Sequence, residues 1–267
     1  MVAVRRMLRN TVPPFLWDYA RRSFGGVWRV TAWPTPNADG WTKAAASAAK
    51  GYEEGIRRMT QGEALSYLPT EEPAAWLDSD PQFHHRIVQL GLVAARKTGM
   101  DYTLSILDYG GGFGGHAHAL KRMLPQLRLQ YTVCELPAFC ELGRKLNPAV
   151  RFVSSLEEAG KGYNLVYASS SVQYTQDWRK LLRDLSAACA GGLFITRTPF
   201  ISTGATFVNM QRAYGTVWPG WVFNKEEFVR EVHATSPMRL REVFMNGRGL
   251  AVRGAAEPNV HLGLLFE

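Results

Sequence analysis

Long hydrophobic runs are missing from this chain of 267 residues, and cysteine is scarce. No stretch of 18 consecutive apolar residues occurs, so no segment is predicted to span a membrane. The three cysteines are odd in number and show no C-x-x-C spacing, and we expect buried, reduced thiols (Cys134, Cys140 and Cys189). No apolar segment follows the arginines of residues 1–10, and no internal repeat occurs. These absences lead us to expect a cytoplasmic protein without a signal peptide.

The net charge of +8 is concentrated near the amino terminus. Residues 1–30 carry six arginines and one aspartate, a local balance of +5, with aromatic and aliphatic side chains between them. An amphipathic basic segment of this kind is typical of peripheral contact with an anionic membrane or of a phosphorylated partner. The alternative is a helical extension that packs on the core and leaves its arginines in water. No nucleic-acid-binding motif accompanies the charge, so we expect no nucleic acid partner.

The most informative stretch is the glycine-rich turn at residues 110–115. It follows a short apolar run at 104–107 that predicts a buried strand, and it precedes a predicted helix. Glycines at such a junction let a ligand approach the backbone, because no Cβ is present and positive φ is accessible. Glu135 ends a second apolar run, at a place where a carboxylate accepts hydrogen bonds from both hydroxyls of a ribose. Together the two features predict a nucleoside site in an α/β protein.

The identity of the nucleoside depends on Asp108. Gly110, Gly112 and Gly115 also satisfy the G-x-G-x-x-G dinucleotide fingerprint. Asp108 stands two residues before the first glycine, at the carboxyl end of the strand, where we expect it to meet a cationic amino group directly or through water. Its charge would repel a pyrophosphate. We therefore predict S-adenosylmethionine, with a nicotinamide cofactor and a purely structural turn as the alternatives.

The apolar patterns divide the chain into an N-terminal helical extension, residues 1–80, and one α/β domain, residues 81–267. The extension contains a predicted alanine-rich helix. The domain ends in two predicted strands without a helix between them, which favours an antiparallel pair. The predicted helices are 41–59, 81–97, 114–123, 137–146, 177–188 and 225–233, and the predicted strands are 104–108, 129–134, 150–153, 163–168, 192–197, 240–245 and 260–265. The fold class is therefore α/β, with a Rossmann-like, seven-stranded, mostly parallel sheet and a C-terminal antiparallel hairpin.

Six segments carry a resemblance to a known family: 50–52, 107–112, 135–137, 169–174, 197–200 and 218–223. On these segments the chain resembles the class I S-adenosylmethionine-dependent methyltransferases, over roughly residues 80–267. More narrowly, it is similar to a group of bacterial methyltransferases often associated with surface-polysaccharide genes. The resemblance implies methyl transfer from S-adenosylmethionine to a small molecule or glycan, in polysaccharide biosynthesis. A nicotinamide-dependent oxidoreductase and a non-catalytic S-adenosylmethionine-binding protein are the alternatives.

The glycine turn and the resemblance together imply a set of cofactor contacts. These are Tyr52, Asp108, Gly110, Gly112, Glu135, Leu136, Ser155, Ser169, Ser171 and Gln173. Because Gly51 interrupts an alanine-rich helix next to Tyr52, we expect the N-terminal helices to fold over the cofactor as a lid. Packing of Tyr52 in the core is the competing explanation.

Several missing features narrow the chemistry. No Asn-Pro-Pro-Tyr loop, typical of DNA adenine and protein glutamine methyltransferases, follows the strand at 163–168, and no paired carboxylates supply a Mg²⁺ site. His116 and His118 point to different faces of a predicted helix, so we expect no metal. We predict O-methylation, in which a base assists the hydroxyl. His116 and Tyr174 are candidates, with contact to backbone or cofactor, or packing, as their competing roles.

Substrate contacts are predicted after the strand that ends at Arg197, because ligands bind beyond the carboxyl ends of parallel strands. Its guanidinium suits a carboxylate or phosphate near the methyl group, so we expect an anionic acceptor and include Arg197 among the catalytic residues. A loop-rich stretch then supplies aromatic and polar side chains that suit a sugar: Gln211, Tyr214, Trp218 and Trp221. Packing of the tryptophans and a structural ion pair of Arg197 are the alternatives. The sequence leaves the oligomeric state open.

Overall fold

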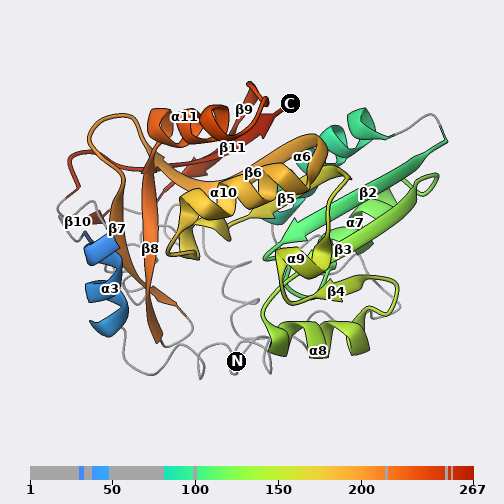
Figure 1. Ribbon diagram of the computed structural model, residues 1–267, viewed down its shortest axis with the longest axis horizontal. Helices are drawn as coiled ribbons and strands as arrows, with labels where there is room; N and C mark the ends of the chain where they lie inside the picture. Colours follow the sequence, from blue (N-terminus) through green and yellow to red (C-terminus); the bar gives the residue numbers. More distant parts are fainter. Residues whose placement is uncertain are drawn as a thin grey trace, which may run out of the picture.

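The computed structural model describes residues 30–32, 38–47, 81–98, 101–213, 216–249, 252–253 and 255–267. Figure 1 shows their arrangement, in which helices cover a long twisted sheet. The helices are α3 (Ala38–Ser47), α6 (Pro81–Lys97), α7 (Gly115–Met123), α8 (Pro137–Leu146), α9 (Leu156–Ala159), the 3₁₀ turn η1 (Val172–Tyr174), α10 (Trp178–Ala188) and α11 (Lys225–Thr235). The strands are β1 (Val30–Ala32), β2 (Thr103–Tyr109), β3 (Arg128–Cys134), β4 (Arg151–Val153), β5 (Tyr163–Ser169), β6 (Cys189–Ile201), β7 (Phe207–Ala213), β8 (Thr216–Asn224), β9 (Leu240–Arg248), β10 (Val252–Arg253) and β11 (Val260–Phe266). No helix in these ranges is long and apolar enough to cross a membrane.

Seven strands form the central sheet, in the order β4-β3-β2-β5-β6-β11-β9. The first five run parallel, whereas β11 is antiparallel to both β6 and β9. The predicted seven-stranded, mostly parallel sheet with an antiparallel pair at one edge is confirmed. The carboxyl ends of β2, β3, β5 and β6 therefore lie side by side at one edge of the sheet.

A second group of strands branches from the far end of β6, in the order β8-β7-β1-β10. β6 runs to Ile201, beyond the predicted end at Arg197, and its last two residues pair with β8. β7 and β8 form an antiparallel hairpin that extends away from the central sheet (Figure 1). The prediction of a loop-rich stretch over 211–221 is therefore wrong. Pro219 and Gly220 resemble loop residues in the sequence, yet both lie within β8.

The central sheet carries helices on both faces. On one face, α10 and α11 bury Trp178, Leu182 and Phe228 against the strands, and the rings of Trp178 and Phe228 stack at 5.7 Å between centroids. On the other face, α6 and α7 bury Leu90 and Leu120. Each fully buried leucine contributes on the order of 2 kcal/mol of stability. Since successive strand residues point to opposite faces, both sides of β2 and β5 are apolar, as parallel strands between helix layers require.

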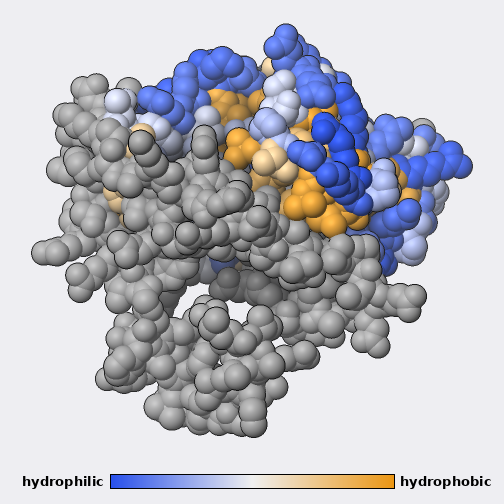
Figure 2. All heavy atoms as spheres, turned by 90° about the horizontal axis from the view of Figure 1, so that it is seen from below, coloured by the Kyte–Doolittle hydropathy of each residue, from blue (hydrophilic) through white to orange (hydrophobic). Residues whose placement is uncertain are grey.

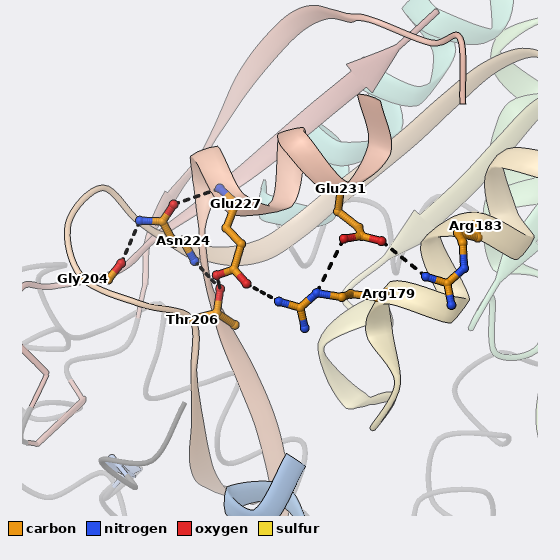
Figure 3. Close-up of polar contacts among 7 residues, drawn as sticks. All are labelled: Arg179, Arg183, Gly204, Thr206, Asn224, Glu227 and Glu231. Carbon is orange, nitrogen blue, oxygen red and sulfur yellow. Dashed lines mark hydrogen bonds and ion pairs between the residues drawn. The ribbon is translucent and has the colours of Figure 1, made fainter. Parts of the chain in front are cut away.

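Polar contacts at the start of α11 join it to the β6–β7 connection and to α10 (Figure 3). Asn224 caps the helix, because its Oδ1 accepts from the N–H of Glu227 at 3.0 Å, while its own N–H donates to Thr206 Oγ1 at 3.0 Å. The Thr206 hydroxyl donates to the Glu227 carboxylate in turn. Arg179 of α10 pairs with Glu227 and, at 3.5 Å, with Glu231. These half-exposed ion pairs add little energy individually, but together they orient α11 on α10.

The N-terminal part of the chain is described in two segments. α3 overlaps the start of the helix predicted over 41–59 and packs on β7 and β8, where Trp41 stacks on Trp221 at 5.5 Å between centroids. β1, which the sequence did not predict, pairs with β7. Residues 48–80 lie outside the described residues, so the lid remains a prediction.

The surface of the described residues carries both hydrophobic and hydrophilic side chains. Seen from below, a group of hydrophobic residues is bordered by hydrophilic ones (Figure 2). The large hydrophobic side chains with exposed fractions above two fifths are Val88, Leu92, Tyr102, Met123, Leu136, Val243 and Met245. Among them, Leu136 lies next to the predicted cofactor residue Glu135.

Candidate functional site

The glycine turn lies at the carboxyl edge, directly after β2. Gly110, Gly112 and Gly114 have φ values of 73°, 58° and 78°, in the left-handed region that favours glycine. The N–H of Gly110 donates to the carbonyl of Cys134 at 2.9 Å, which joins the turn to the end of β3. Gly114 stands at the N-cap of α7, so the chain passes from strand to helix within the turn.

One side of this turn is closely packed and the other is open. A Cβ on Gly110 would lie 2.4 Å from the Ser171 Cβ, and a Cβ on Gly111 would lie 2.5 Å from the Asp108 carboxyl carbon. A Cβ on Gly112 would meet no atom of the described residues within 4 Å. Ser171, which follows β5, and Asp108 of β2 therefore pack closely against the turn at Gly110 and Gly111. The backbone at Gly112 instead faces space that a ligand can occupy.

Glu135 lies against the open part of the turn. Its Oε1 accepts from the N–H of Gly112 at 3.4 Å, and its Oε2 accepts from the N–H of Leu136 at 2.7 Å. Burial raises the pKa of Glu135, and the two backbone hydrogen bonds oppose that shift. The structure thus brings the turn and the carboxylate together, as the sequence indicated, and leaves Leu136 42% exposed beside them. Contact with a ribose stays a prediction.

Asp108 is fully buried beneath the turn. Its Oδ2 accepts from the Tyr131 hydroxyl at 2.7 Å and contacts His116 Nδ1 at 3.0 Å, so it joins β2 to β3 and α7. Burial and the adjacent carboxylate raise the pKa of Tyr131 well above its usual value. Oδ1 has no hydrogen-bond partner among the described residues. The sequence did not predict this structural role; the contact with an amino group remains a prediction, for which Oδ1 is available.

His116 is the second residue of α7, and its ring packs edge-on against Tyr167 of β5 at 5.2 Å between centroids. The contact of its Nδ1 with Asp108 Oδ2 at 3.0 Å fixes the orientation of the ring. The side chain is 15% exposed. This arrangement resembles an oriented base, although the sequence signal was only the position of His116 after the glycines. Its role in catalysis remains a prediction.

The residues after β5 meet the turn from the neighbouring strand. Ser171 Oγ donates to the carbonyl of Tyr109 at 2.7 Å, and Ser170 has a left-handed φ of 57°. Gln173 is 2% exposed, and its Nε2 donates to Ser170 Oγ at 3.1 Å. The buried Ser169 Oγ and Gln173 Oε1 have no hydrogen-bond partner among the described residues. Because buried polar atoms are normally satisfied, these two atoms and Asp108 Oδ1 are positions at which a polar group from outside the described residues could bind.

Ser155 lies at the exposed start of α9. Its Oγ accepts from the N–H of Glu158 at 3.1 Å and caps this short helix, which explains a serine at this position. The predicted cofactor contact of Ser155 is a separate role that stays a prediction. Tyr52 and Tyr214 lie outside the described residues, and Gln211 lies on β7 with its side chain outside them.

The two tryptophans of β8 differ in their surroundings. Trp221 is 4% exposed, stacks on Trp41 and donates its Nε1 hydrogen to the carbonyl of Thr175, so packing accounts for this residue. Trp218 is half-buried and lies edge-on to Tyr174 at 6.1 Å between centroids. The hairpin thus brings Trp218 and Tyr174 together from segments far apart in the sequence.

Arg197 stands at the carboxyl edge, but within β6. Thr196 pairs with Ser169, the last residue of β5, so Arg197 follows directly beyond the end of β5. Its φ is 55°, rare for a residue with a side chain, and the pairing with β11 shifts register at this point. A β-bulge of this kind turns a side chain in a new direction. His261 of β11, which the sequence did not indicate, pairs with Pro199, two residues after Arg197 on β6, and the charge of Arg197 lowers its pKa further after burial.

Among the described residues, no three His, Cys, Asp or Glu side chains are grouped so that they could hold a metal ion. A cavity of about 460 Å³ lies away from the glycine turn, between β3 and the α9–β5 connection, and includes Arg151 and Lys161 in its lining. It contains none of the predicted site residues. The candidate site is therefore the carboxyl edge and not this cavity.

Known proteins resemble the chain in fold only. No family model and no curated protein matches it. CalS10, a SAM-bound amino pentose methyltransferase from Micromonospora echinaspora, is 15% identical with a TM-score of 0.48, over 73% of this chain and 96% of that one. The mitomycin 7-O-methyltransferase MmcR is 16% identical with a TM-score of 0.43, over 80% and 67%. The [4+2]-cyclase SpnF is 15% identical with a TM-score of 0.48, over 67% and 80%. These similarities concern the fold, and the three names differ in the chemistry that they describe.

Proposed function

We propose that this chain is an S-adenosylmethionine-dependent methyltransferase that binds its cofactor at the carboxyl ends of β2, β3 and β5. The observation that carries the proposal is the turn at Gly112, open to a ligand, with the Glu135 carboxylate at its side. Among the described residues, the two oxygens of Glu135 accept hydrogen bonds from backbone N–H groups and from no side chain. A ribose would offer two hydroxyl donors to the same carboxylate, and Leu136 would offer an apolar surface to the adenine.

The unsatisfied atoms fit the amino acid end of the cofactor. Asp108 Oδ1, Ser169 Oγ and Gln173 Oε1 can all accept hydrogen bonds, and they lie on or just after β2 and β5. An ammonium group carries three donors. Neighbouring strands are about 4.8 Å apart, so the distance from Glu135, just after β3, to Ser169 at the end of β5 is about 10 Å across the edge. A nucleoside with an amino acid tail is extended enough to cover such a distance.

Bound S-adenosylmethionine would supply a methyl group on a sulfonium, activated for in-line transfer. The residues of the chain would orient the acceptor, exclude water and receive a proton. We infer a hydroxyl acceptor on a small molecule or glycan, without a metal. His116 supports this, because its contact with Asp108 orients an imidazole in the helix that directly follows the glycine turn, where a general base could serve the acceptor. The half-buried Trp218 beside Tyr174 supports a sugar, which packs its C–H face on an aromatic ring.

Calorimetry with S-adenosylmethionine and, separately, with NADH tests the cofactor. We expect the former to bind, and Glu135→Ala to weaken it by about 1–3 kcal/mol, the range for a lost charge-assisted pair of hydrogen bonds. Glu141→Ala is the matched control, because Glu141 is an exposed residue of the adjacent α8 whose carboxylate pairs, within the described part of the chain, with Lys145 of the same helix. Unchanged affinity in a folded Glu135→Ala variant, or binding of NADH alone, would overturn the proposal.

A further inference from the structure

Arg197 is a half-buried cation with no visible anion. Its side chain is neither exposed nor fully buried, and among the described residues no carboxylate pairs with it and no hydrogen bond holds it. Other arginines of the domain do have such partners, as Arg179 does with Glu227. Removing a guanidinium from water without a counter-ion is unfavourable, so this position is expected to receive an anion from outside the described residues.

The backbone at Arg197 is also strained. Between the pairs Ile195–Leu264 and Thr198–Leu262, β6 contains one residue more than β11, and Arg197 takes up the difference at a φ of 55°. A glycine would adopt this conformation at no steric cost, whereas a side chain adopts it at a penalty. The chain nevertheless has an arginine at the bulge. A charged side chain placed in this way, at the edge where β5 ends, is oriented by the strand and not by a flexible loop.

His261 is the second member of this arrangement. It lies on β11 between Pro199 of β6 and Gly247 of β9, neither of which is titratable. Burial, and after it the positive charge of Arg197, lower the pKa of His261 to about 4. The imidazole is therefore neutral at pH 7, and its one N–H can donate to an anion without adding a second buried charge.

We propose that Arg197 and His261 form the subsite for an oxyanion, a carboxylate or phosphate, of the molecule that the site acts on. Arg197 would form two parallel hydrogen bonds to the anion, and His261 would add a third. As the binding place of the methyl acceptor, the subsite rests on the proposed function. It deepens that function by assigning the acceptor a negative charge, held one strand beyond the residues proposed for the cofactor.

The test uses the full-length protein, with inorganic phosphate and acetate as probes and no cofactor. Proton NMR follows the imidazole signal of His261, assigned from its loss in His261→Gln. Binding of either probe should raise the pKa of His261, because the anion offsets the field of Arg197. Preference for phosphate or for acetate separates the two kinds of oxyanion. If neither probe shifts the His261 titration at millimolar concentrations, the subsite does not exist.

Arg197→Gly distinguishes a binding role from a structural one. Glycine removes the strain, so the urea midpoint should equal or exceed that of the wild type, while the dissociation constant for phosphate rises about tenfold or more. Arg128→Gln, at the exposed start of β3, is the matched loss of charge and should leave phosphate binding unchanged. A destabilised Arg197→Gly protein that still binds phosphate normally would overturn the subsite.

Failure of the subsite and failure of the proposed function give different results. Calorimetry with S-adenosylmethionine on Arg197→Gly should match the wild type, because Arg197 is not among the cofactor residues. Phosphate binding without any binding of S-adenosylmethionine would leave the subsite standing and remove the methyltransferase. The reverse result would remove the subsite alone.

Discussion

Gly110→Ala should destabilise the fold through two separate effects that the structure allows us to estimate. The φ of 73° places the new side chain in the left-handed region, which costs about 1–2 kcal/mol. In addition, the new Cβ would lie 2.4 Å from the Cβ of Ser171. A Cβ is tied to the backbone and cannot rotate away, so one strand end must shift, at a cost of about 1–3 kcal/mol. The expected loss of unfolding free energy is about 2–5 kcal/mol.

Gly112→Ala is the control for the first effect. It has a similar φ of 58°, but no atom of the described residues lies within 4 Å of the new Cβ, so the expected loss is only the conformational one of about 1–2 kcal/mol. Adding Ser171→Gly to Gly110→Ala removes the atom in the way. In a double-mutant cycle the pair should show a favourable coupling of about 1–3 kcal/mol, even though Ser171→Gly alone loses its hydrogen bond to Tyr109.

Urea unfolding followed by circular dichroism measures all four variants, provided that the m-values agree. The reasoning is refuted if Gly110→Ala is no less stable than Gly112→Ala, or if the cycle shows no coupling. The effects of these two substitutions on cofactor affinity should not follow their effects on stability. Gly112→Ala places its Cβ in the open space and should reduce the binding of S-adenosylmethionine despite its milder effect on stability.

Two further predictions concern stability. The pKa of Cys134 is raised from 9.0 to about 12, chiefly by burial. The protonated thiol therefore stabilises the folded state fully below pH 9, and this stabilisation is lost as the pH rises through 12. Between these values the wild type should therefore lose about 4 kcal/mol more unfolding free energy than Cys134→Ala, measured by urea titration at each pH; parallel curves would contradict this. Asn224→Ala removes the cap of α11 and should reduce the unfolding free energy by about 1 kcal/mol, whereas Asn224→Asp keeps an acceptor and should lose less. Equal urea midpoints for the wild type and Asn224→Ala would show that the cap does not stabilise the helix.

Local patterns were enough to predict the central sheet. Apolar runs at 104–107 and 163–168, with turn residues after them, predict strands because side-chain alternation and chain breaks act over a few residues. The helix predicted at 81–97 agrees with α6, and the two C-terminal strands agree with β9 and β11. The glycines and Glu135 were recognisable because parallel strands bring their carboxyl ends to a common edge.

The hairpin β7–β8 was not predictable in the same way. Pro219 and Gly220 argue against a strand on local grounds, and the strand exists because β7 pairs along its length and α3 packs Trp41 on Trp221. These partners are distant in the sequence, so their contribution has no local signal. The same holds for Tyr131, whose hydroxyl meets Asp108 only because β3 pairs with β2 in that register.

The order of the residues was enough to predict the strands of the central sheet and most of the helices that cover it. It was also enough to predict that a glycine turn and a carboxylate follow neighbouring strands. Periodicity and backbone freedom are properties of a few adjacent residues, which is why they can be read without the fold. Three features became visible only in the folded chain: the burial of Asp108 next to the turn, the strained bulge at Arg197, and the effect of the charge of Arg197 on His261. These features depend on strand register and on burial, and both arise from contacts between residues far apart in the chain.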